Sequence, residues 1–251
     1  MEEFHFFQIF IRFLHNLLEL VNEKKKELAY DQHYIKIKGV YPSVFALKMF
    51  LGKNPEFNLT NINFNNKNIL DVGFGDGRDL SLFINLGFNV YGIEPSTSVV
   101  EHTIKKFSKH SNKPKLSTGN NIRTNLKDDF FDFVYASGSI YYMPNQNNTI
   151  IDAFNEAYRI TKKNGYFLGT LAKNDTHTIK NAREIKPNIF ILKDEFYKQR
   201  EGQIYHTYQN KTEIINHLNK AGFSNPLIFD YNVDWFGTKE TLFIFVCQKL
   251  N

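Results

Sequence analysis

The segment that most constrains the fold is residues 69–80, with the sequence Ile-Leu-Asp-Val-Gly-Phe-Gly-Asp-Gly-Arg-Asp-Leu. An apolar run ends at Val72, and glycines follow at three alternate positions. Glycines in this arrangement permit backbone torsions with positive φ and let a ligand approach the main chain closely. The segment therefore predicts a strand, a glycine loop and a helix, a unit that binds ligands at the carboxyl end of a parallel strand.

The residues around the glycines narrow the choice of ligand. The dinucleotide pattern G-x-G-x-x-G needs a glycine where this chain has Arg78, and the Gly-Lys-Ser/Thr of a phosphate-binding loop is missing. Asp71 precedes the glycines, and a carboxylate there repels a pyrophosphate but attracts an ammonium group. S-adenosylmethionine carries an ammonium and a sulfonium and no phosphate. The loop therefore favours this cofactor, with contacts from Asp71, Gly73 and Gly75.

Polar residues also follow the next two predicted strands. Glu94 ends the second strand, where a carboxylate can accept hydrogen bonds from both ribose hydroxyls. Asn120 and Asn121 follow the third strand, where an amide can meet the adenine amino group and Ile122 can cover the ring face. Three such features at the ends of three successive strands predict one site for an adenosine-containing cofactor.

From residue 67 onward, strand and helix patterns alternate, which predicts a mainly parallel, doubly wound α/β sheet. The last two strands have a short connection, which favours an antiparallel hairpin at a sheet edge. The predicted strands are 67–72, 89–93, 115–117, 131–136, 166–171, 227–231 and 242–247. The predicted helices are 78–86, 96–108, 149–161 and 212–220. We divide the chain into an N-terminal helical extension and lid, 1–66, and a domain, 67–251, with an irregular insert at 173–208.

Composition limits the setting and the partners of the protein. Cys247 is the only cysteine, which excludes a disulfide within the chain and favours a reducing cytoplasm. The net charge is +5, but the only dense basic run, residues 24–26, is flanked by acids, so a nucleic-acid partner is not favoured. Residues 3–28 predict a helix with one wide apolar face that polar residues interrupt too often for a membrane span. That face predicts packing on its own domain or on a second subunit in a homodimer, and attachment to a membrane surface is the least favoured alternative because the polar face is not richly basic.

The sequence resembles the class I S-adenosylmethionine-dependent methyltransferases of the small-molecule type. Five segments are similar to consecutive motifs of that family: 70–77, 91–96, 117–121, 131–144 and 157–167. Asn120 stands where the family usually has an aspartate. The resemblance implies a Rossmann-like seven-stranded sheet with an antiparallel last strand, S-adenosylmethionine as cofactor, and methyl transfer. It also implies cofactor contacts from Pro95 and Ser137, and from Tyr30 in a lid segment before the first strand.

The chemistry of the acceptor decides which further groups are needed. A carboxylate is already nucleophilic, whereas an alcohol needs a base or a metal to help remove its proton. The candidates for catalysis are Tyr142 after the fourth strand, His177 after the fifth, and His206 in the insert. Arg183 or Arg200 in the insert is suited to a substrate phosphate. No His or carboxylate pair has convincing metal spacing, so no required metal is expected.

Three functions are consistent with these features. The first is O-methylation of a small acceptor, which we expect to be a sugar, anionic or nucleotide-linked, in bacterial surface-polysaccharide synthesis. A small phosphorylated or carboxylic acid metabolite is the alternative acceptor. The second is a tRNA or rRNA methyltransferase, and the third is a non-catalytic protein that binds S-adenosylmethionine.

Overall fold

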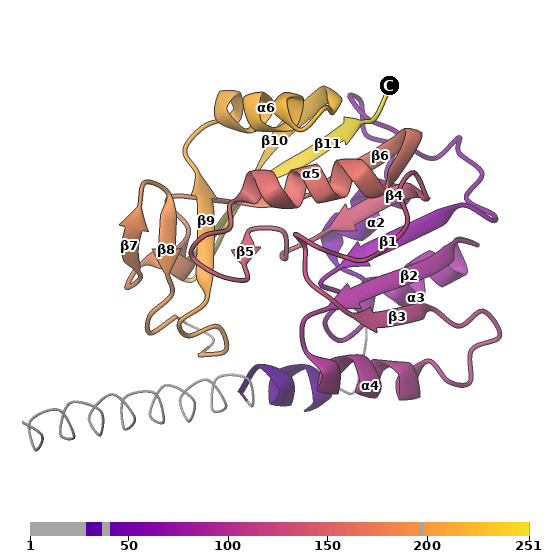
Figure 1. The fold of residues 1–251 in the computed structure, drawn as a ribbon, viewed down its shortest axis with the longest axis horizontal. Coiled ribbons are helices and arrows are strands. Elements are labelled where there is room, and N and C mark those ends of the chain that lie inside the picture. Colours follow the sequence, from indigo (N-terminus) through magenta and orange to yellow (C-terminus); the bar gives the residue numbers. More distant parts are fainter. Residues whose placement is uncertain (1–28, 37–40, 196–197, 251) are drawn as a thin grey trace, which may run out of the picture.

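The structure is a computed structural model that describes residues 29–36, 41–195 and 198–250. Within these residues, a central sheet has the strand order β3–β2–β1–β4–β6–β11–β10 (Figure 1). The first five of these strands are parallel, and β11 runs antiparallel to both of its neighbours. Their bounds are β1 Asn68–Val72, β2 Asn89–Glu94, β3 Lys115–Thr118, β4 Phe131–Ala136, β6 Thr161–Lys173, β10 Ser224–Trp235 and β11 Thr238–Gln248.

This sheet confirms the predicted Rossmann-like α/β fold with seven strands and an antiparallel last strand. β11, the last strand in the sequence, lies between β6 and β10. Its antiparallel pairing with β10 agrees with the short connection between these two strands. The helix predicted over 3–28 lies outside the described residues. Residues 29–36 are helical, and the part of the chain that the structure describes contains no helix long and apolar enough to cross a membrane.

Helices cover both faces of the central sheet (Figure 1). Because alternate residues of a strand point to opposite faces, β4 contributes Tyr135 to one core and Val134 to the other. On the first face Phe83 packs against Tyr135, and on the second Phe154 packs against Phe167. The helices of the first face are α2 Val44–Leu51, α3 Arg78–Asn85 and α4 Thr97–Lys106, and those of the second are α5 Ile150–Ile160 and α6 Lys211–Lys220.

The insert 173–208 is more regular than expected. Together with β5 it forms a small antiparallel sheet of short strands. The last strand of the insert, β9, also pairs with the end of β6, so the small sheet continues the central one. The elements are β5 Tyr142–Met143, the 3-10 helix η1 His177–Ile179, β7 Arg183–Lys186, β8 Ile189–Ile191 and β9 Ile204–Tyr208. The prediction of an irregular insert is therefore wrong.

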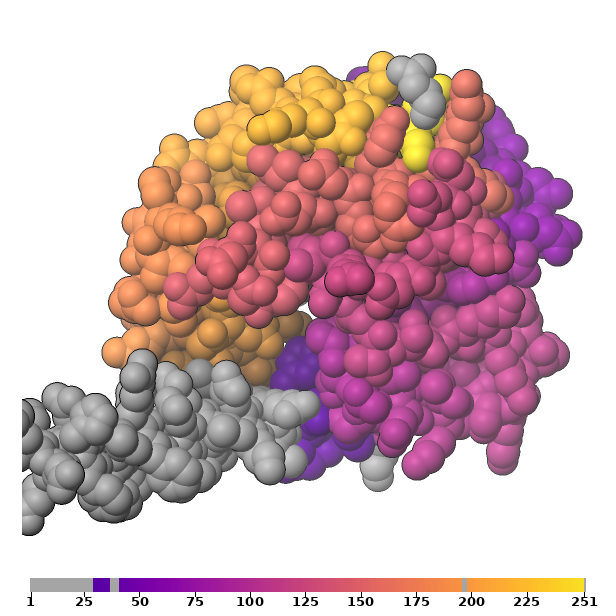
Figure 2. All heavy atoms as spheres, in the orientation of Figure 1, coloured from indigo at the N-terminus to yellow at the C-terminus, as the bar shows by residue number. Residues whose placement is uncertain are grey.

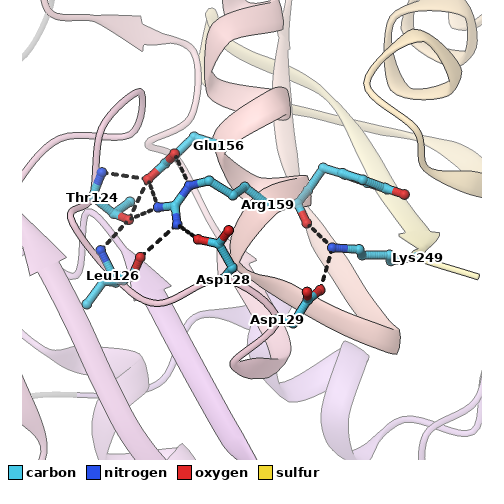
Figure 3. Close-up of polar contacts among 8 residues, drawn as sticks. Thr124, Leu126, Asp128, Asp129, Glu156, Arg159 and Lys249 are labelled. Carbon is cyan, nitrogen blue, oxygen red and sulfur yellow. Dashed lines mark hydrogen bonds and ion pairs between the residues drawn. The ribbon is translucent and has the colours of Figure 1, made fainter. Parts of the chain in front are cut away.

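The loop between β3 and β4 is held by an ion-pair network around Arg159 of α5 (Figure 3). The guanidinium donates to the Glu156 carboxylate at 2.7 and 2.9 Å, to Asp128, and to the backbone carbonyl of Leu126 at 2.8 Å. Glu156 in turn accepts hydrogen bonds from the backbone N–H and the hydroxyl of Thr124. The network fixes the loop that begins at the carboxyl end of β3, where Asn120 lies.

Candidate functional site

The glycine loop after β1 has three left-handed residues, Gly73 at φ 73°, Gly75 at φ 53° and Gly77 at φ 75°. The first two lie nearest the end of the strand. A Cβ atom on Gly73 would lie 2.6 Å from the Cβ of Ser139, and one on Gly75 would lie 2.6 Å from Cε1 of Tyr34. Both torsions and both approaches exclude larger residues. The loop thus needs its glycines, and it is enclosed by Ser139 of the loop after β4 and by Tyr34 of the helix 29–36.

A cavity of about 1010 Å³ lies beside this loop. It opens at the carboxyl ends of β1, β2 and β4, where ligands of such sheets bind. Most of the residues predicted to form the site line it: Tyr30, Asp71, Gly73, Gly75, Glu94, Pro95, Asn120, Asn121, Ser137, Tyr142 and His177. Two do not, namely Ile122 and His206.

One end of the cavity, here named the acidic half, is lined by Asp71, Asp76, Asp79 and Glu94. Burial raises the pKa of Asp71 well above its ordinary value, and the negative charges of Asp79, Glu94 and Asp76 raise it further. Burial also raises the pKa of Glu94. Arg78 forms an ion pair with Asp76 at 3.2 Å. A ligand that brings positive charge to the acidic half would relieve this repulsion.

Glu94 is held by hydrogen bonds at the end of β2. One carboxylate oxygen accepts from the Tyr30 hydroxyl at 2.9 Å, and the other accepts from the backbone N–H of Gly75 at 3.2 Å. The backbone N–H of Ser96 also donates to the carboxylate, at 3.4 Å. These contacts fix the carboxylate beside the glycine loop.

The helix 29–36 lies across the mouth of the cavity and joins its two sides. Toward α4, Asp31 accepts hydrogen bonds from the hydroxyls of Ser96 and Ser98. Toward the insert, His33 contacts Gln199 at 2.9 Å. Figure 2 shows this helix in indigo between the magenta side of the molecule and the orange insert. Tyr30, His33 and Tyr34 of this helix line the cavity, and its role as a lid stays a prediction.

The other end of the cavity is lined by the tyrosine cluster, which we define as Tyr141, Tyr142 and Tyr205. The three ring centroids lie 4.9 to 5.1 Å apart. Burial raises the pKa of Tyr141 to about 12 and raises that of Tyr142 further above its ordinary value. The phenols of these two residues are therefore protonated at neutral pH, so they act as hydrogen-bond donors and not as bases.

The asparagines after β3 have contacts within the protein. Oδ1 of Asn120 accepts from the backbone N–H groups of Ile122 and Arg123, at 3.1 and 3.0 Å. Nδ2 of Asn121 donates to the carbonyls of Ile140 and Tyr142, at 3.0 and 2.9 Å, and so fixes the loop after β4. The Ile122 side chain packs on the core and does not line the cavity. The expectation that Ile122 covers an adenine ring therefore does not fit this structure.

The two candidate histidines are separated by the structure. His177 opens η1 after β6 and lines the cavity. His206 does not, because alternation along β9 places Tyr205 toward the cavity and His206 toward the opposite face. There the His206 ring packs beside Tyr208, and burial lowers its pKa to about 4. This placement corrects the expectation that His206 lies near the reacting groups.

Three contributors to the site were not predicted from the sequence. Asp79 accepts from the backbone N–H of Ser43 at 2.7 Å and from the Tyr135 hydroxyl at 2.6 Å, which ties the start of α2 to the acidic half. Tyr34 and Ser139 close on the glycines, as described above. Asp79 is adjacent to the glycine motif, so its place in the site could have been predicted from the sequence. Tyr34 and Ser139 belong to distant segments, and the sequence does not indicate their approach to the glycines. Arg183 is exposed on β7 and outside the cavity, but Arg200 lines it.

Comparison with known proteins finds a methyltransferase domain in the chain. Residues 70–169 match the family model described as a methyltransferase domain. The match covers 100 of the 251 residues, from β1 into β6, and it supports a methyltransferase domain that uses S-adenosylmethionine as cofactor. No match was found among curated proteins.

Solved structures share the fold at low sequence identity. A methyltransferase from Methanosarcina mazei has 19% identity and a TM-score of 0.62, over 78% of this chain and 98% of that chain. The 1,6-didemethyltoxoflavin-N1-methyltransferase of Burkholderia thailandensis, solved with its acceptor and S-adenosylhomocysteine, has 14% identity and a TM-score of 0.56, over 74% and 72%. Phosphoethanolamine N-methyltransferase 2 of Haemonchus contortus, solved with S-adenosylmethionine, has 13% identity and a TM-score of 0.60, over 90% and 57%.

Proposed function

We propose that the acidic half of the cavity binds S-adenosylmethionine and that the half lined by the tyrosine cluster binds a small acceptor for O-methylation. The single observation that carries this proposal is the continuity of one cavity from the glycine loop to the tyrosine cluster. Such a cavity lets two ligands meet and excludes water around them, which is the main requirement for an in-line methyl transfer.

The residues of the acidic half suit the cofactor. Asp71 and Glu94 are buried carboxylates with raised pKa values, so a cationic ligand is favoured over a phosphorylated one. We assign the ribose hydroxyls to Glu94, the main-chain approach to Gly73 and Gly75, and further contacts to Tyr30, Pro95 and Ser137. Asn120 and Asn121 stay our candidates for the adenine. When bound, the cofactor supplies an electrophilic methyl group.

The acceptor half supplies the groups that an alcohol needs. We assign the role of base to His177, which is half-buried at the cavity wall. It would take the hydroxyl proton as the oxygen becomes an ether. Tyr142, protonated at neutral pH, would orient the acceptor by donating a hydrogen bond. Within the described residues there is no group of three His, Cys, Asp or Glu side chains placed to hold a metal, and the absence of a metal requirement stays a prediction.

We favour as acceptor a sugar, in particular a nucleotide-linked sugar of bacterial surface-polysaccharide synthesis, and the cytoplasm as location. A small phosphorylated or carboxylic acid metabolite is the alternative. The structural neighbours named above include N-methyltransferases, so amines belong in the same screen. We also propose a homodimer through residues 3–28. If it forms, light scattering should show a dimer for the full chain and a monomer, of slightly less than half that mass, for a chain that lacks residues 1–28.

The proposal is tested by measuring release of S-adenosylhomocysteine from S-adenosylmethionine with nucleotide sugars, phosphorylated metabolites and amines. We expect release with a hydroxylated acceptor, and a fall of about a hundredfold or more in kcat for His177→Gln with little change in KM. His110→Gln is the matched control, because His110 is exposed on the surface. Release with amines only, or unchanged kcat in the His177 variant, would contradict O-methylation by this base.

A further inference from the structure

Arg200 lies in the cavity between the lid and the tyrosine cluster. Its guanidinium carbon is 4.3 Å from the ring centroid of Tyr142 and 5.1 Å from that of Tyr30. One of its amino groups donates to the Tyr34 hydroxyl at 2.8 Å. Three aromatic rings from two distant segments therefore define the position of one positive charge.

The backbone below this side chain is also fixed. The carboxylate of Glu195, a buried residue, accepts hydrogen bonds from the backbone N–H groups of Gln199 and Arg200, the second at 2.9 Å. Glu195 thus binds the main chain of the turn that carries Arg200. A long side chain held at both ends loses little further entropy when it binds a ligand.

Arg200 has no direct ion-pair partner within 4.0 Å among the described residues, and its guanidinium donates to a neutral phenol. Burial raises the pKa of Glu94, and the charge of Arg200 acts to lower it, without a salt bridge between the two side chains. Of its five N–H donors, one is used by Tyr34. Stacked rings attract a cation, but they do not accept the in-plane hydrogen bonds of a guanidinium. A half-buried cation with free planar donors is suited to an oxyanion that binds in a bidentate manner.

We propose that Arg200 binds an oxyanion of the acceptor, a phosphate or a carboxylate, and so selects anionic acceptors. The inference rests on the proposed function and names the class of acceptor for the same cavity. The acceptor is the partner, and not the carboxylate of the cofactor, because Arg200 packs closest to Tyr142 of the tyrosine cluster. The cation beside the glycine loop is Arg78, which already pairs with Asp76.

The test measures anion binding without turnover. Protein saturated with S-adenosylhomocysteine is titrated by calorimetry with inorganic phosphate, pyrophosphate, acetate and neutral glucose at constant ionic strength. We expect the wild type to bind at least one anion and not to bind glucose. Arg200→Gln should bind the anion at least about tenfold more weakly, and the affinity of Arg200→Lys should lie between those of the wild type and Arg200→Gln. Arg183→Gln is the matched control, since Arg183 is an exposed arginine of the same insert, and it should bind like the wild type.

A loss that is larger for phosphate and pyrophosphate supports a phosphorylated acceptor, and a larger loss for acetate supports a carboxylic acid. Equal anion affinity in the wild type and Arg200→Gln would overturn the proposal. It would also be overturned if Arg200→Gln bound S-adenosylhomocysteine more weakly than the wild type but bound the anions equally well. If Arg200→Gln does not fold, unchanged anion affinity in Arg200→Lys overturns it instead. Because no methyl transfer is measured, failure here is distinct from failure to methylate an alcohol.

Discussion

Asp71 is the residue whose environment most clearly indicates the charge of the ligand. Its carboxylate is buried at the end of β1, and three other carboxylates around it raise its pKa. Because the pKa of Asp71 is raised in the folded protein, ionisation of its carboxyl destabilises the fold when no cofactor is bound. A bound cation offsets this destabilisation. Cofactor affinity should therefore depend on pH through the protonation of Asp71.

We predict opposite effects on stability and on binding for Asp71→Asn. Removal of the charge relieves repulsion, so the Tm of the cofactor-free variant should rise in differential scanning fluorimetry. Affinity for S-adenosylmethionine should fall about tenfold or more, because a charge-assisted contact is lost. Wild-type affinity should also fall as the pH is lowered through the raised pKa of Asp71. A variant that is less stable and binds equally well would show that Asp71 is only a structural residue.

His206 gives a second pH effect, far from the cavity. Its Nδ1 is buried without a hydrogen-bond partner among the described residues, and burial lowers its pKa to about 4 from 6.5. The unfolded chain therefore binds the extra proton more readily between these values, and stability falls as the pH drops from 6.5 to 4. The size is on the order of 3 kcal/mol for this shift.

Urea unfolding of wild type and His206→Gln at a series of pH values checks this. The difference in unfolding free energy between the two proteins should shrink or reverse as the pH falls from 6.5 to 4. His110→Gln, a change at an exposed ring, should keep the slope of the wild type. Parallel curves for wild type and His206→Gln would mean that His206 is not buried in its neutral form.

At the scale of elements, the network of Arg159 joins α5 to the loop after β3. Although burial raises the pKa of Glu156, hydrogen bonds from Arg159 and Thr124 hold it below its ordinary value. Arg159→Met should lower the free energy of unfolding by about 1–3 kcal/mol, since several charge-assisted hydrogen bonds are lost together. Chemical denaturation measures this, with Arg123→Met as an exposed control. Equal losses in both variants would mean that the network contributes nothing specific.

The lid helix 29–36 is the element that we expect to respond to the cofactor. Its contacts reach Glu94 and Ser96 on one side and Gln199 and Arg200 on the other. S-adenosylhomocysteine should therefore slow amide hydrogen exchange in 29–36 and in 198–203. Exchange in α6, on the opposite face of the sheet, is the internal control. Unchanged exchange in the lid with bound ligand would show that it does not close over the site.

The elements differ in how far the sequence predicts them. β1, β2 and β4 have local signals, namely apolar runs that end at a polar or glycine position, and their predicted bounds are close to the observed ones. β7, β8 and β9 are short, and their order comes from pairing with one another and with β5. Such pairing is a property of tertiary structure, and no periodicity in 173–208 indicates it.

The same distinction applies to the site. Asp71 and Glu94 lie next to their motifs and are predictable from them, whereas the approach of Tyr34 to Gly75 joins residues 41 positions apart in sequence. His177 lies among polar residues in the sequence, whereas His206 lies between Tyr205 and Thr207 in a segment that contains aromatic residues. The position of each ring relative to the cavity comes from the tertiary structure, because β9 presents His206 away from the cavity.

At the scale of the whole molecule, one cavity joins an acidic half, a lid and a tyrosine cluster with Arg200 between them. Four carboxylates line the acidic half, and the guanidinium of Arg200 lies between the lid and the tyrosine cluster. This arrangement suits a cationic cofactor beside an anionic acceptor. It also agrees with the sequence of the glycine loop, which has Arg78 in place of the third glycine of a dinucleotide-binding loop and lacks the Gly-Lys-Ser/Thr of a phosphate-binding loop.

The most direct test of this account is a calorimetric titration of the wild type and Glu94→Gln with S-adenosylmethionine, with NAD as the competing dinucleotide. Glu94 is fixed by Tyr30, Gly75 and Ser96, so the variant changes one charge in a defined place. We predict one S-adenosylmethionine per wild-type chain, affinity about tenfold or more weaker in Glu94→Gln, and no binding of NAD. Equal affinity in the two proteins, or binding of NAD in place of S-adenosylmethionine, would contradict it.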